Sequence, residues 1–408
     1  MDNKLRLYIA LPVMDESDNL ENLISILKLQ TYTNFELVVC VNQYDHWWLD
    51  ETKKHICEDN RRSLEYLKIV NCFDISIIDK SSKGRGWLKK KGGVGWARKV
   101  LMDSISARAS STDIIVSIDA DTYYPKNYLE QIMIFFEHNS KLFGLGLPYY
   151  HRLAKDETDR LILRYEIYMR YYMLNMLRID NPFGFTALGS AMAFPVWAYT
   201  KVGGLTPVAA GEDFYFLQKL VKSGKIGIWT DTIAYPSPRL SDRVAFGTGP
   251  ALIKGCSGNW SSYPIYNYKS FDDVHATFQS FSNLYKDNTD TPMDKFIEET
   301  FGSKNIWDPL RANYKDILNF EKACNNKVDG LRILQFLRWQ DKENGSNDEK
   351  NLFDFLKKFH RNEMDDKLID KFHKFDYQES ELDTLTKIRD LLFNIEMRVR
   401  KKLHVENT

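Results

Sequence analysis

Short apolar runs alternate with amphipathic stretches along the first third of the chain. The apolar runs cover residues 5–11, 36–41, 74–78 and 113–118. Between them, apolar residues recur every three to four positions over residues 18–30 and 94–105, which is the period of one helix face. Strands that alternate with helices predict an α/β fold with a mainly parallel central sheet. Ligands of such sheets bind beyond the carboxyl ends of the strands.

The pattern changes in the middle of the chain. Residues 159–179 form one long helical stretch rich in tyrosine and methionine. We expect its aromatic side chains to pack on the sheet, although tyrosine also suits a surface that faces an acceptor or a lipid. After about residue 272 the sequence is helical in pattern, charged and lysine-rich. We therefore predict an α/β domain over residues 1–270 and an α-helical C-terminal region over residues 271–408.

The charge balance narrows the range of functions. The 408 residues include 56 lysines and arginines and 56 aspartates and glutamates, so the formal net charge is zero. A general nucleic-acid-binding protein would carry a basic excess, and we expect no nucleic-acid partner.

Three sequence features bear on the compartment. No run reaches the roughly 18–20 apolar residues that a membrane span requires. The first residues lack the apolar core of a signal peptide. The five cysteines are scattered and without CxxC spacing, which favours free thiols in a reducing compartment. These features predict a cytoplasmic protein and leave peripheral contact with the inner face of a membrane open.

Two carboxylates follow the last of the predicted strands. Asp119 and Asp121 flank Ala120 directly after the run DIIVSI. Side chains two positions apart in an extended segment point to the same side, and adjacent carboxylates repel unless a proton or a cation lies between them. A divalent ion, Mn²⁺ or Mg²⁺, prefers such oxygen ligands, whereas the alternative is an ordinary turn. We predict both aspartates as metal ligands, with Asp121 the better candidate for direct coordination.

A second acidic pair opens a later helical stretch. Glu212 and Asp213 follow Gly211 and precede residues with helical periodicity. Acidic residues at a helix start also act as caps and complement the helix dipole. The catalytic interpretation makes Asp213 a general base that accepts the proton of an acceptor hydroxyl. It requires a fold that brings Asp213 close to Asp121.

Two further segments carry groups suited to phosphate. Residues 92–99, GGVGWARK, place glycines at the start of a helix, where backbone N–H groups favour anions. A basic run over residues 83–91 would attract a diphosphate, although such runs are more often solvated surface. In the segment 236–249, Arg239 and Arg243 lie four positions apart, and arginine suits bidentate contact with phosphate. An ordinary structured loop is an equally good interpretation of that segment.

Taken in order along residues 5–235, these motifs resemble those of family-2 glycosyltransferases. The opening segment matches the family at Pro12, Glu16, Gln30 and Tyr32. GGVGWARK resembles the family's glycine-then-ARN segment, and SIDADTYYP resembles its DxD strand end. The most specific match, residues 189–229, contains a glycine loop, a KVGG turn and the acidic pair. The chain departs from the family at Asn42 and the residue after it, where an acidic pair usually follows the second strand, and it lacks the QxxRW motif of processive members.

The resemblance implies a GT-A fold and a nucleoside-diphosphate sugar as the donor. It implies that residues 1–121 form the nucleotide-sugar-binding half of the domain and residues 122–270 the acceptor-binding half. Asp213 would be the catalytic base and Glu212 its acceptor-side neighbour. The residues implied in binding the nucleotide sugar are Pro12, Glu16, Asn42, Gly92, Arg98, Asp119, Ala120, Asp121, Arg239 and Arg243.

These expectations define a metal-dependent glycosyltransferase that moves a sugar to an acceptor hydroxyl with inversion. The acceptor would be a glycan, a lipid-linked molecule or a small molecule, in the synthesis of a surface or lipid-linked polysaccharide. Three alternatives stay open: a retaining transferase on the same fold, a non-catalytic nucleotide-sugar-binding or scaffold protein, and a sugar nucleotidyltransferase. The last would normally carry a glycine-rich basic loop after the first strand, where this chain has PVMDESD.

Overall fold

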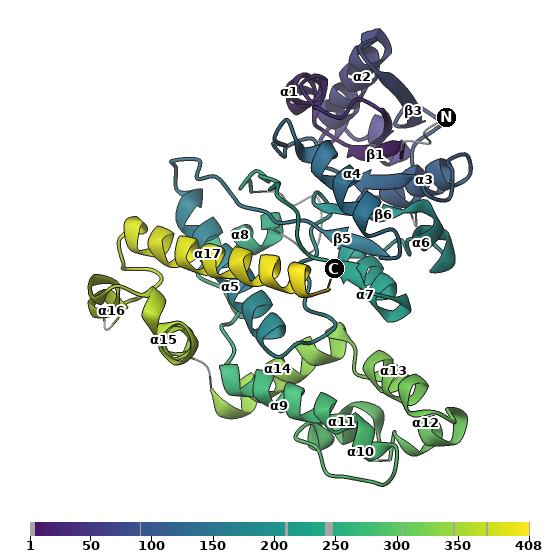
Figure 1. Ribbon diagram of the computed structural model, residues 1–408. Coiled ribbons are helices and arrows are strands. Elements are labelled where there is room, and N and C mark those ends of the chain that lie inside the picture. Colours follow the sequence, from purple (N-terminus) through teal and green to yellow (C-terminus); the bar gives the residue numbers. More distant parts are fainter. Residues whose placement is uncertain are drawn as a thin grey trace. The chain divides into compact units, whose positions relative to one another are not determined.

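The computed structural model describes residues 5–89, 91–208, 211–240, 248–303, 305–345, 347–372 and 374–407 (Figure 1). The chain forms two compact units, each built from separate stretches of sequence. The α/β unit comprises Met1–Ile162, Thr186–Gly258 and Arg400–Thr408, and the helical unit comprises Leu163–Phe185 and Asn259–Val399. The predicted fold class, with a mainly parallel central sheet and a helical C-terminal region, is confirmed.

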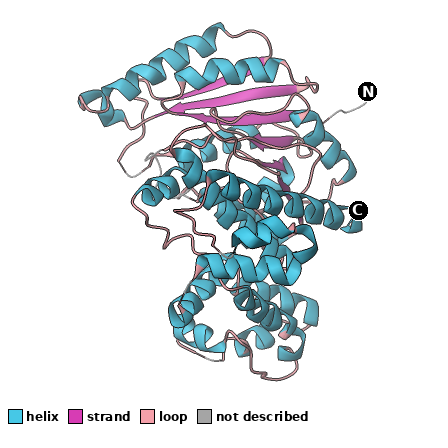
Figure 2. Ribbon diagram, turned by 90° about the vertical axis from the view of Figure 1, so that its left-hand side faces the viewer, coloured by secondary structure: helices cyan, strands magenta, loops and turns pink. Residues whose placement is uncertain are grey.

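A single sheet runs through the α/β unit, with helices packed beside it (Figure 2). Among the described residues its strand order is β3-β2-β1-β4-β6-β5-β7. The strands are β1 (Leu7–Val13), β2 (Phe35–Asn42), β3 (Asp74–Lys80), β4 (Ile114–Ser117), β5 (Gly144–Gly146), β6 (Met192–Pro195) and β7 (Ile226–Gly227). The first four are parallel to one another, β6 runs antiparallel between β4 and β5, and β7 is parallel to β5. The carboxyl ends of β1 and β4 therefore meet at one edge of the sheet.

The central strands are covered on both faces, which explains why they appear in the sequence as nearly continuous apolar runs. Every residue of β2 and of β4 is buried. Leu7 of β1 lies opposite Phe35 of β2 on one side and opposite Ile114 of β4 on the other. This register places the carboxyl ends of β1, β2 and β4 side by side, so the residues that follow these strands lie near one another.

The periodicity predicted three helices of the α/β unit, those over residues 17–28, 94–106 and 212–223, and missed the other helices described there. Its helices are η1 (Asp45–Leu49), α1 (Ser17–Lys28), α2 (Lys54–Ile69), α3 (Val94–Ser106), α4 (Tyr128–His138), α6 (Val196–Lys201), α7 (Glu212–Ser223) and α8 (Thr248–Cys256). The bounds of α1 and α3 are close to those predicted. The missed helix α2 buries Asp59, Asn60 and Ser63 on its inner face, so its apolar spacing is interrupted.

The helical unit contains the rest of the helices. Helix α5 (Thr158–Arg178) begins in the α/β unit and belongs to the helical unit from Leu163 on. The others are α9 (Tyr268–Gln279), α10 (Phe281–Leu284), α11 (Asp294–Phe301), α12 (Asp308–Asn313), α13 (Ile317–Lys327), α14 (Gly330–Asn344), α15 (Asp348–Phe359), η2 (Arg361–Glu363), α16 (Asp366–Phe372) and α17 (Leu382–Asn407).

The tyrosines of α5 have partners that the sequence analysis did not expect. The ring of Tyr171 lies 4.9 Å from that of Phe355 on α15, and its hydroxyl donates to the Tyr266 carbonyl oxygen at 2.5 Å. The Tyr168 ring lies 5.4 Å from that of Tyr263. The prediction that these side chains pack on the sheet is therefore wrong for Tyr168 and Tyr171, which pack within the helical unit.

Buried ion pairs join α5 to α17 inside the helical unit. Arg170 and Glu166 are both fully buried and paired on α5, and the Arg170 guanidinium also donates to Glu396 Oε2 at 2.7 Å. Arg389 lies 3.3 Å from the second oxygen of Glu166. Charges this far from water are tolerated only when each has a partner.

Removing one partner of these buried ion pairs should therefore destabilise the folded protein. Arg170→Met is expected to lower the free energy of unfolding by about 3–5 kcal/mol, because it removes the cation that pairs with the buried carboxylates of both Glu166 and Glu396. Urea denaturation followed by circular dichroism would measure the change. Arg361→Met is the control, since Arg361 pairs with Asp366 at the surface and should matter little. An equal effect of both variants would contradict this account of the network.

The end of α17 belongs to the α/β unit. The Arg400 guanidinium donates to the Ile228 carbonyl oxygen at 3.0 Å and to Thr186 Oγ1 at 2.9 Å. All three residues lie in the α/β unit, so the last turns of α17 are part of this unit.

Two further expectations concern the chain as a whole. The five cysteines are free thiols, as predicted. Within the described residues, no helix is both long enough and apolar enough to cross a membrane.

Candidate active site

The first acidic motif lies where β4 ends. Asp119 and Asp121 follow the last residue of β4, and Glu16 immediately precedes α1 after the neighbouring strand β1. Two hydrogen bonds hold the turn that carries the aspartates. The Asp119 N–H donates to the Tyr124 hydroxyl at 3.0 Å, and this hydroxyl donates to the Ser190 carbonyl oxygen at 3.0 Å. Parallel pairing of β1 with β4 thus brings three carboxylates from two segments to one edge of the sheet.

Arg239 connects the carboxylates of the two segments. Its Nε lies 2.8 Å from Asp121 Oδ2. Its Nη1 donates to Glu16 Oε2 at 3.1 Å, and its Nη2 pairs with the other oxygen of Glu16. Of the two arginines predicted in this loop, Arg239 therefore lies at the carboxylate cluster, whereas Arg243 is outside the described residues.

The loop that carries Arg239 is fixed a few residues earlier. Tyr235 exchanges two backbone hydrogen bonds with Tyr123, each of 3.0 Å, and the Tyr150 N–H donates to the Ala234 carbonyl oxygen at 2.9 Å. The Arg152 guanidinium lies over both rings, 4.4 Å from the centre of Tyr123 and 4.3 Å from that of Tyr235. These contacts hold the loop beside the segment that follows Asp121.

Burial and like charges change the ionisation of this cluster. Burial raises the pKa of Asp121 to about 7; Arg239 opposes the rise, and Asp119 and Glu16 add to it. Burial also raises the pKa of Glu16, again against the effect of Arg239. A cluster in which carboxylates resist ionisation is one that a further cation would stabilise.

The second acidic motif is joined to the first by Arg98. This arginine lies on the inner face of α3 and is almost fully buried. Its Nη2 donates to Asp119 Oδ1 at 2.6 Å and its Nη1 to Glu212 Oε1 at 3.1 Å. Burial lowers the pKa of Arg98, whereas the negative charges of Asp119, Glu212 and Asp213 raise it by more. The net shift of the pKa is upward, so Arg98 stays a cation. One guanidinium thus fixes the distance between two motifs that are far apart in the sequence.

The start of α7 presents the acidic pair to this site. Gly211, with a φ of 75°, turns the chain into the helix, and Glu212 and Asp213 form its first turn. The start of α3 lies close by, because a Cβ added to Gly95 would approach the Val208 carbonyl oxygen to 2.6 Å. Glu212 is buried, which raises the pKa of its carboxyl against the opposing effect of Arg98. Asp213 is partly exposed, and its Oδ1 accepts a hydrogen bond from the Phe214 N–H at 2.7 Å.

Gly189 makes room for the Arg98 guanidinium. A Cβ added to Gly189 would lie 2.4 Å from Arg98 Nη2, and the Gly189 carbonyl oxygen accepts from Ser117 Oγ at 2.7 Å.

Gly189→Ala is therefore expected to displace Arg98 and to lower the free energy of unfolding by about 1–3 kcal/mol. Thermal denaturation would show this as a lower Tm. Gly146→Ala is the control, because its Cβ would meet the Thr186 carbonyl oxygen at an ordinary 3.6 Å, and a similar loss there would count against the steric explanation.

Other predicted residues are held in local contacts. The Asn42 amide is buried and already used, since Nδ2 donates to the Val13 carbonyl oxygen at 2.9 Å and Oδ1 accepts from Trp87 Nε1 at 3.0 Å. Gly92 packs against the Tyr44 ring, which a Cβ would approach to 2.5 Å. Pro12 lies within β1, and Ala120 is buried between the two aspartates. The role of these residues in binding a nucleotide sugar stays a prediction.

The carboxylate cluster fits a divalent cation in its chemistry. Glu16, Asp119 and Asp121 offer the hard oxygen ligands that Mg²⁺ and Mn²⁺ prefer. In the part of the chain that the structure describes, no three His, Cys, Asp or Glu side chains are placed so that together they could hold a metal ion. A metal here would therefore take its other ligands from phosphate or water, as Mg²⁺ commonly does when one or two carboxylates hold it.

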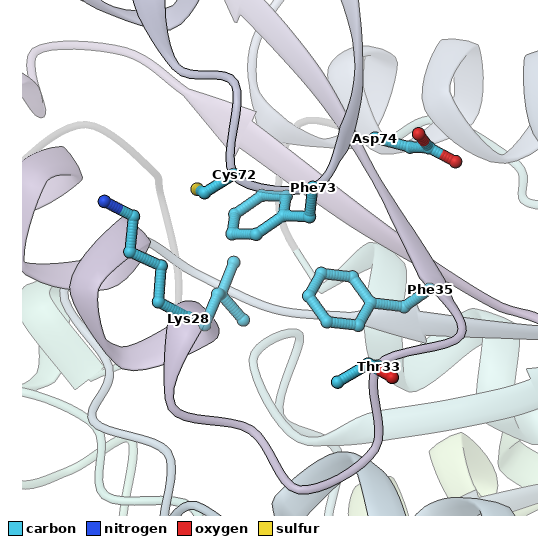
Figure 3. Close-up of a pocket in the computed structure, with 7 residues that line it drawn as sticks. Lys28, Thr33, Phe35, Cys72, Phe73 and Asp74 are labelled. Atoms are coloured by element: carbon cyan, nitrogen blue, oxygen red, sulfur yellow. The ribbon is translucent and has the colours of Figure 1, made fainter.

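A separate pocket lies at the opposite edge of the sheet (Figure 3). Its lining is Leu27, Lys28, Thr33, Phe35, Cys72, Phe73 and Asp74, from the ends of α1 and the starts of β2 and β3. Its volume is about 400 Å³. Because it lies at the amino ends of the strands, it is distinct from the carboxylate cluster, which lies beyond the carboxyl ends.

The molecule is thus an α/β protein in which two acidic motifs lie beyond the carboxyl ends of the strands, where sheets of this kind bind their ligands. The chain belongs to glycosyl transferase family group 2, whose sequence model matches residues 114–319, and it is a glycosyltransferase. A search of curated protein sequences found no significant match.

Several solved structures are similar to this chain at low sequence identity. TarS 1-349 of S. aureus in complex with UDP-GlcNAc is 13% identical, with 84% of this chain and 92% of that chain covered and a TM-score of 0.41. The mannosyltransferase PcManGT from Pyrobaculum calidifontis, in complex with GDP-Man and Mn²⁺, is 12% identical, with coverages of 98% and 87% and a TM-score of 0.39. A mycobacterial protein is 14% identical, with coverages of 58% and 65% and a TM-score of 0.31.

Proposed function

We propose that this glycosyltransferase moves a sugar from a nucleoside diphosphate to an acceptor hydroxyl, with a divalent metal and with inversion at the anomeric carbon. The observation that carries the proposal is the ion-pair bridge through Arg98, which places Asp119 of the first acidic motif and Glu212 of the second around one guanidinium. Two acidic motifs at one site supply what the reaction needs, a place for the metal–diphosphate and a base for the acceptor.

On the donor side, Asp121 and Asp119 are the proposed metal ligands. When bound, Mn²⁺ or Mg²⁺ neutralises the charge that grows on the departing diphosphate. Arg98 occupies one oxygen of Asp119 and orients that carboxylate. Asp121 is contacted by the half-exposed Arg239, and it is the better candidate for direct coordination.

On the acceptor side, Asp213 is the proposed general base. Its carboxylate takes the proton of the acceptor hydroxyl while that oxygen forms a bond to the anomeric carbon. The bond from this carbon to the diphosphate oxygen breaks on the opposite face, and the diphosphate leaves with the electron pair. Glu212, fixed by Arg98, positions Asp213 at the start of α7. A single base of this kind supports inversion, because a single displacement needs no covalent sugar–enzyme intermediate.

The same assignment divides donor binding and acceptor binding between two segments of the chain. We propose that residues 1–121 bind the nucleotide sugar and residues 122–270 bind the acceptor, since Glu16 and Asp121 lie in the first segment and Asp213 in the second. A role in surface or lipid-linked polysaccharide synthesis, and attachment to the inner face of a membrane, stay predictions from the sequence.

The test is thermal stability of the purified protein against a panel of nucleoside diphosphates, with Mn²⁺ or with EDTA. A ligand that binds only the folded state raises the apparent stability, by about 2.7 kcal/mol at a concentration of 100 times Kd. We expect one nucleotide to raise the Tm, and EDTA to abolish the shift. A folded protein that responds to no nucleotide would favour a non-catalytic role, and a retained anomeric configuration in the product would overturn inversion.

A further inference from the structure

One guanidinium already contacts Asp121, the better candidate for a ligand of the donor's metal, together with the neighbouring Glu16. All three nitrogens of Arg239 are used, one on Asp121 and two on Glu16. The Glu16 side chain is 7% exposed and that of Asp121 17%, so both depend on a partner rather than on water. A cation that reached Asp121 Oδ2 would have to compete with Arg239.

The two arginines of the site differ in how firmly they are held. Arg98 is 3% exposed and lies among Ser117, Asp119 and Glu212. Arg239 is 32% exposed and lies four residues beyond Tyr235, whose backbone hydrogen bonds with Tyr123 hold the loop. The Arg239 side chain can therefore change partners while its loop stays in place, whereas Arg98 has no such freedom.

Charge favours a change of partner when the donor arrives. Without ligand, Glu16, Asp119, Asp121 and Glu212 share the positive charges of Arg239 and Arg98. A metal–diphosphate brings two positive charges to the carboxylates and several negative oxygens beside them. A guanidinium binds phosphate oxygens in the same bidentate manner as carboxylate oxygens. The N–H groups released from the carboxylates thus find new acceptors on the diphosphate.

We propose that Arg239 couples metal binding to diphosphate binding by exchanging its partners. In the ligand-free enzyme it occupies the carboxylates and weakens the binding of metal alone. With the nucleoside diphosphate present it moves to the phosphate oxygens and leaves Asp121 to the metal, so each ligand strengthens the other. This inference rests on the proposed function, and it assigns to Arg239 a role beyond that of a phosphate contact.

The first measurement is Mn²⁺ affinity of the full-length protein without nucleotide, from the electron paramagnetic resonance signal of free Mn²⁺. Arg239→Gln is expected to bind Mn²⁺ more tightly than the wild type, by roughly 5- to 150-fold, the usual range of coupling between sites. Arg239→Lys should lie between the two, because one ammonium group cannot reproduce the three contacts. Arg61→Gln is the control for charge, since Arg61 is exposed on α2 and pairs with Glu58 and Glu65.

The second measurement is affinity for the nucleoside diphosphate found by thermal shift, at saturating Mn²⁺. Arg239→Gln should bind it more weakly than the wild type, since the phosphate loses its guanidinium. Opposite changes in the two affinities are the signature of partner exchange, because a merely structural role would weaken both. Mn²⁺ affinity that is unchanged or weaker in Arg239→Gln overturns the inference, even where the wild type binds metal and nucleotide together. A wild type that shows no metal-dependent nucleotide binding would instead overturn the proposed function.

Discussion

Asp213→Asn is expected to lower turnover by about 10²- to 10⁴-fold, the usual contribution of a positioned general base. Asparagine has the same shape but accepts no proton at neutral pH. Its side-chain oxygen can still accept the hydrogen bond from the Phe214 N–H, so the first turn of α7 should keep its structure. Donor binding should change little, because the lost function concerns the acceptor hydroxyl.

Release of the nucleoside diphosphate from its sugar measures this effect, with an added acceptor or with water as the nucleophile. Asp231→Asn provides a matched control at an exposed aspartate of the same unit. A variant at Asp213 that keeps near-wild-type turnover would remove this residue from the mechanism. A variant that loses turnover together with donor binding would point to a folding defect instead.

Asp121→Ala is expected to cost at least as much turnover, because stabilisation of the departing diphosphate is usually a larger contribution than proton transfer. It should also abolish the metal-dependent part of the nucleotide thermal shift. The fold should tolerate the change, since burial, Asp119 and Glu16 already raise the pKa of the Asp121 carboxyl to about 7 and so disfavour its ionised form. Arg239 would keep both contacts to Glu16.

The measurements are turnover at several Mn²⁺ concentrations and Tm with and without nucleotide. Asp119→Ala is an informative comparison, because it also leaves Arg98 with one carboxylate fewer and should lower the Tm of the ligand-free protein. Full metal-dependent activity in Asp121→Ala would exclude this residue as a ligand of the metal.

The strands that carry the site could be predicted because they are buried on both faces. β1, β2 and β4 leave apolar runs that are recognisable without knowledge of their neighbours. The strands β5 and β7 have only three and two residues, too few to leave a period in the sequence. Helix α2 was missed for a different reason, since its inner face is partly polar.

The acidic motifs could likewise be predicted from their places after a strand and at a helix start. Which of the predicted site residues pair with one another could not be predicted, because the salt bridges Arg239–Glu16 and Arg98–Glu212 join segments that no local pattern connects. One signal for Arg98 was present in the sequence. It lies on the same helix face as Leu101, Met102 and Ile105, all buried, where a lone arginine needs an acidic partner.

The return of α17 to the α/β unit has a consequence for how the protein is made. The segment from Asn259 to Val399 must leave the ribosome before Arg400 can reach Ile228 and Thr186. At about 5–20 residues per second, that interval lasts roughly 7–28 s. During it, the sheet and its acidic motifs are already synthesised, but the residues that complete their unit are not. For that time, chaperones meet a nascent chain whose α/β unit is still incomplete.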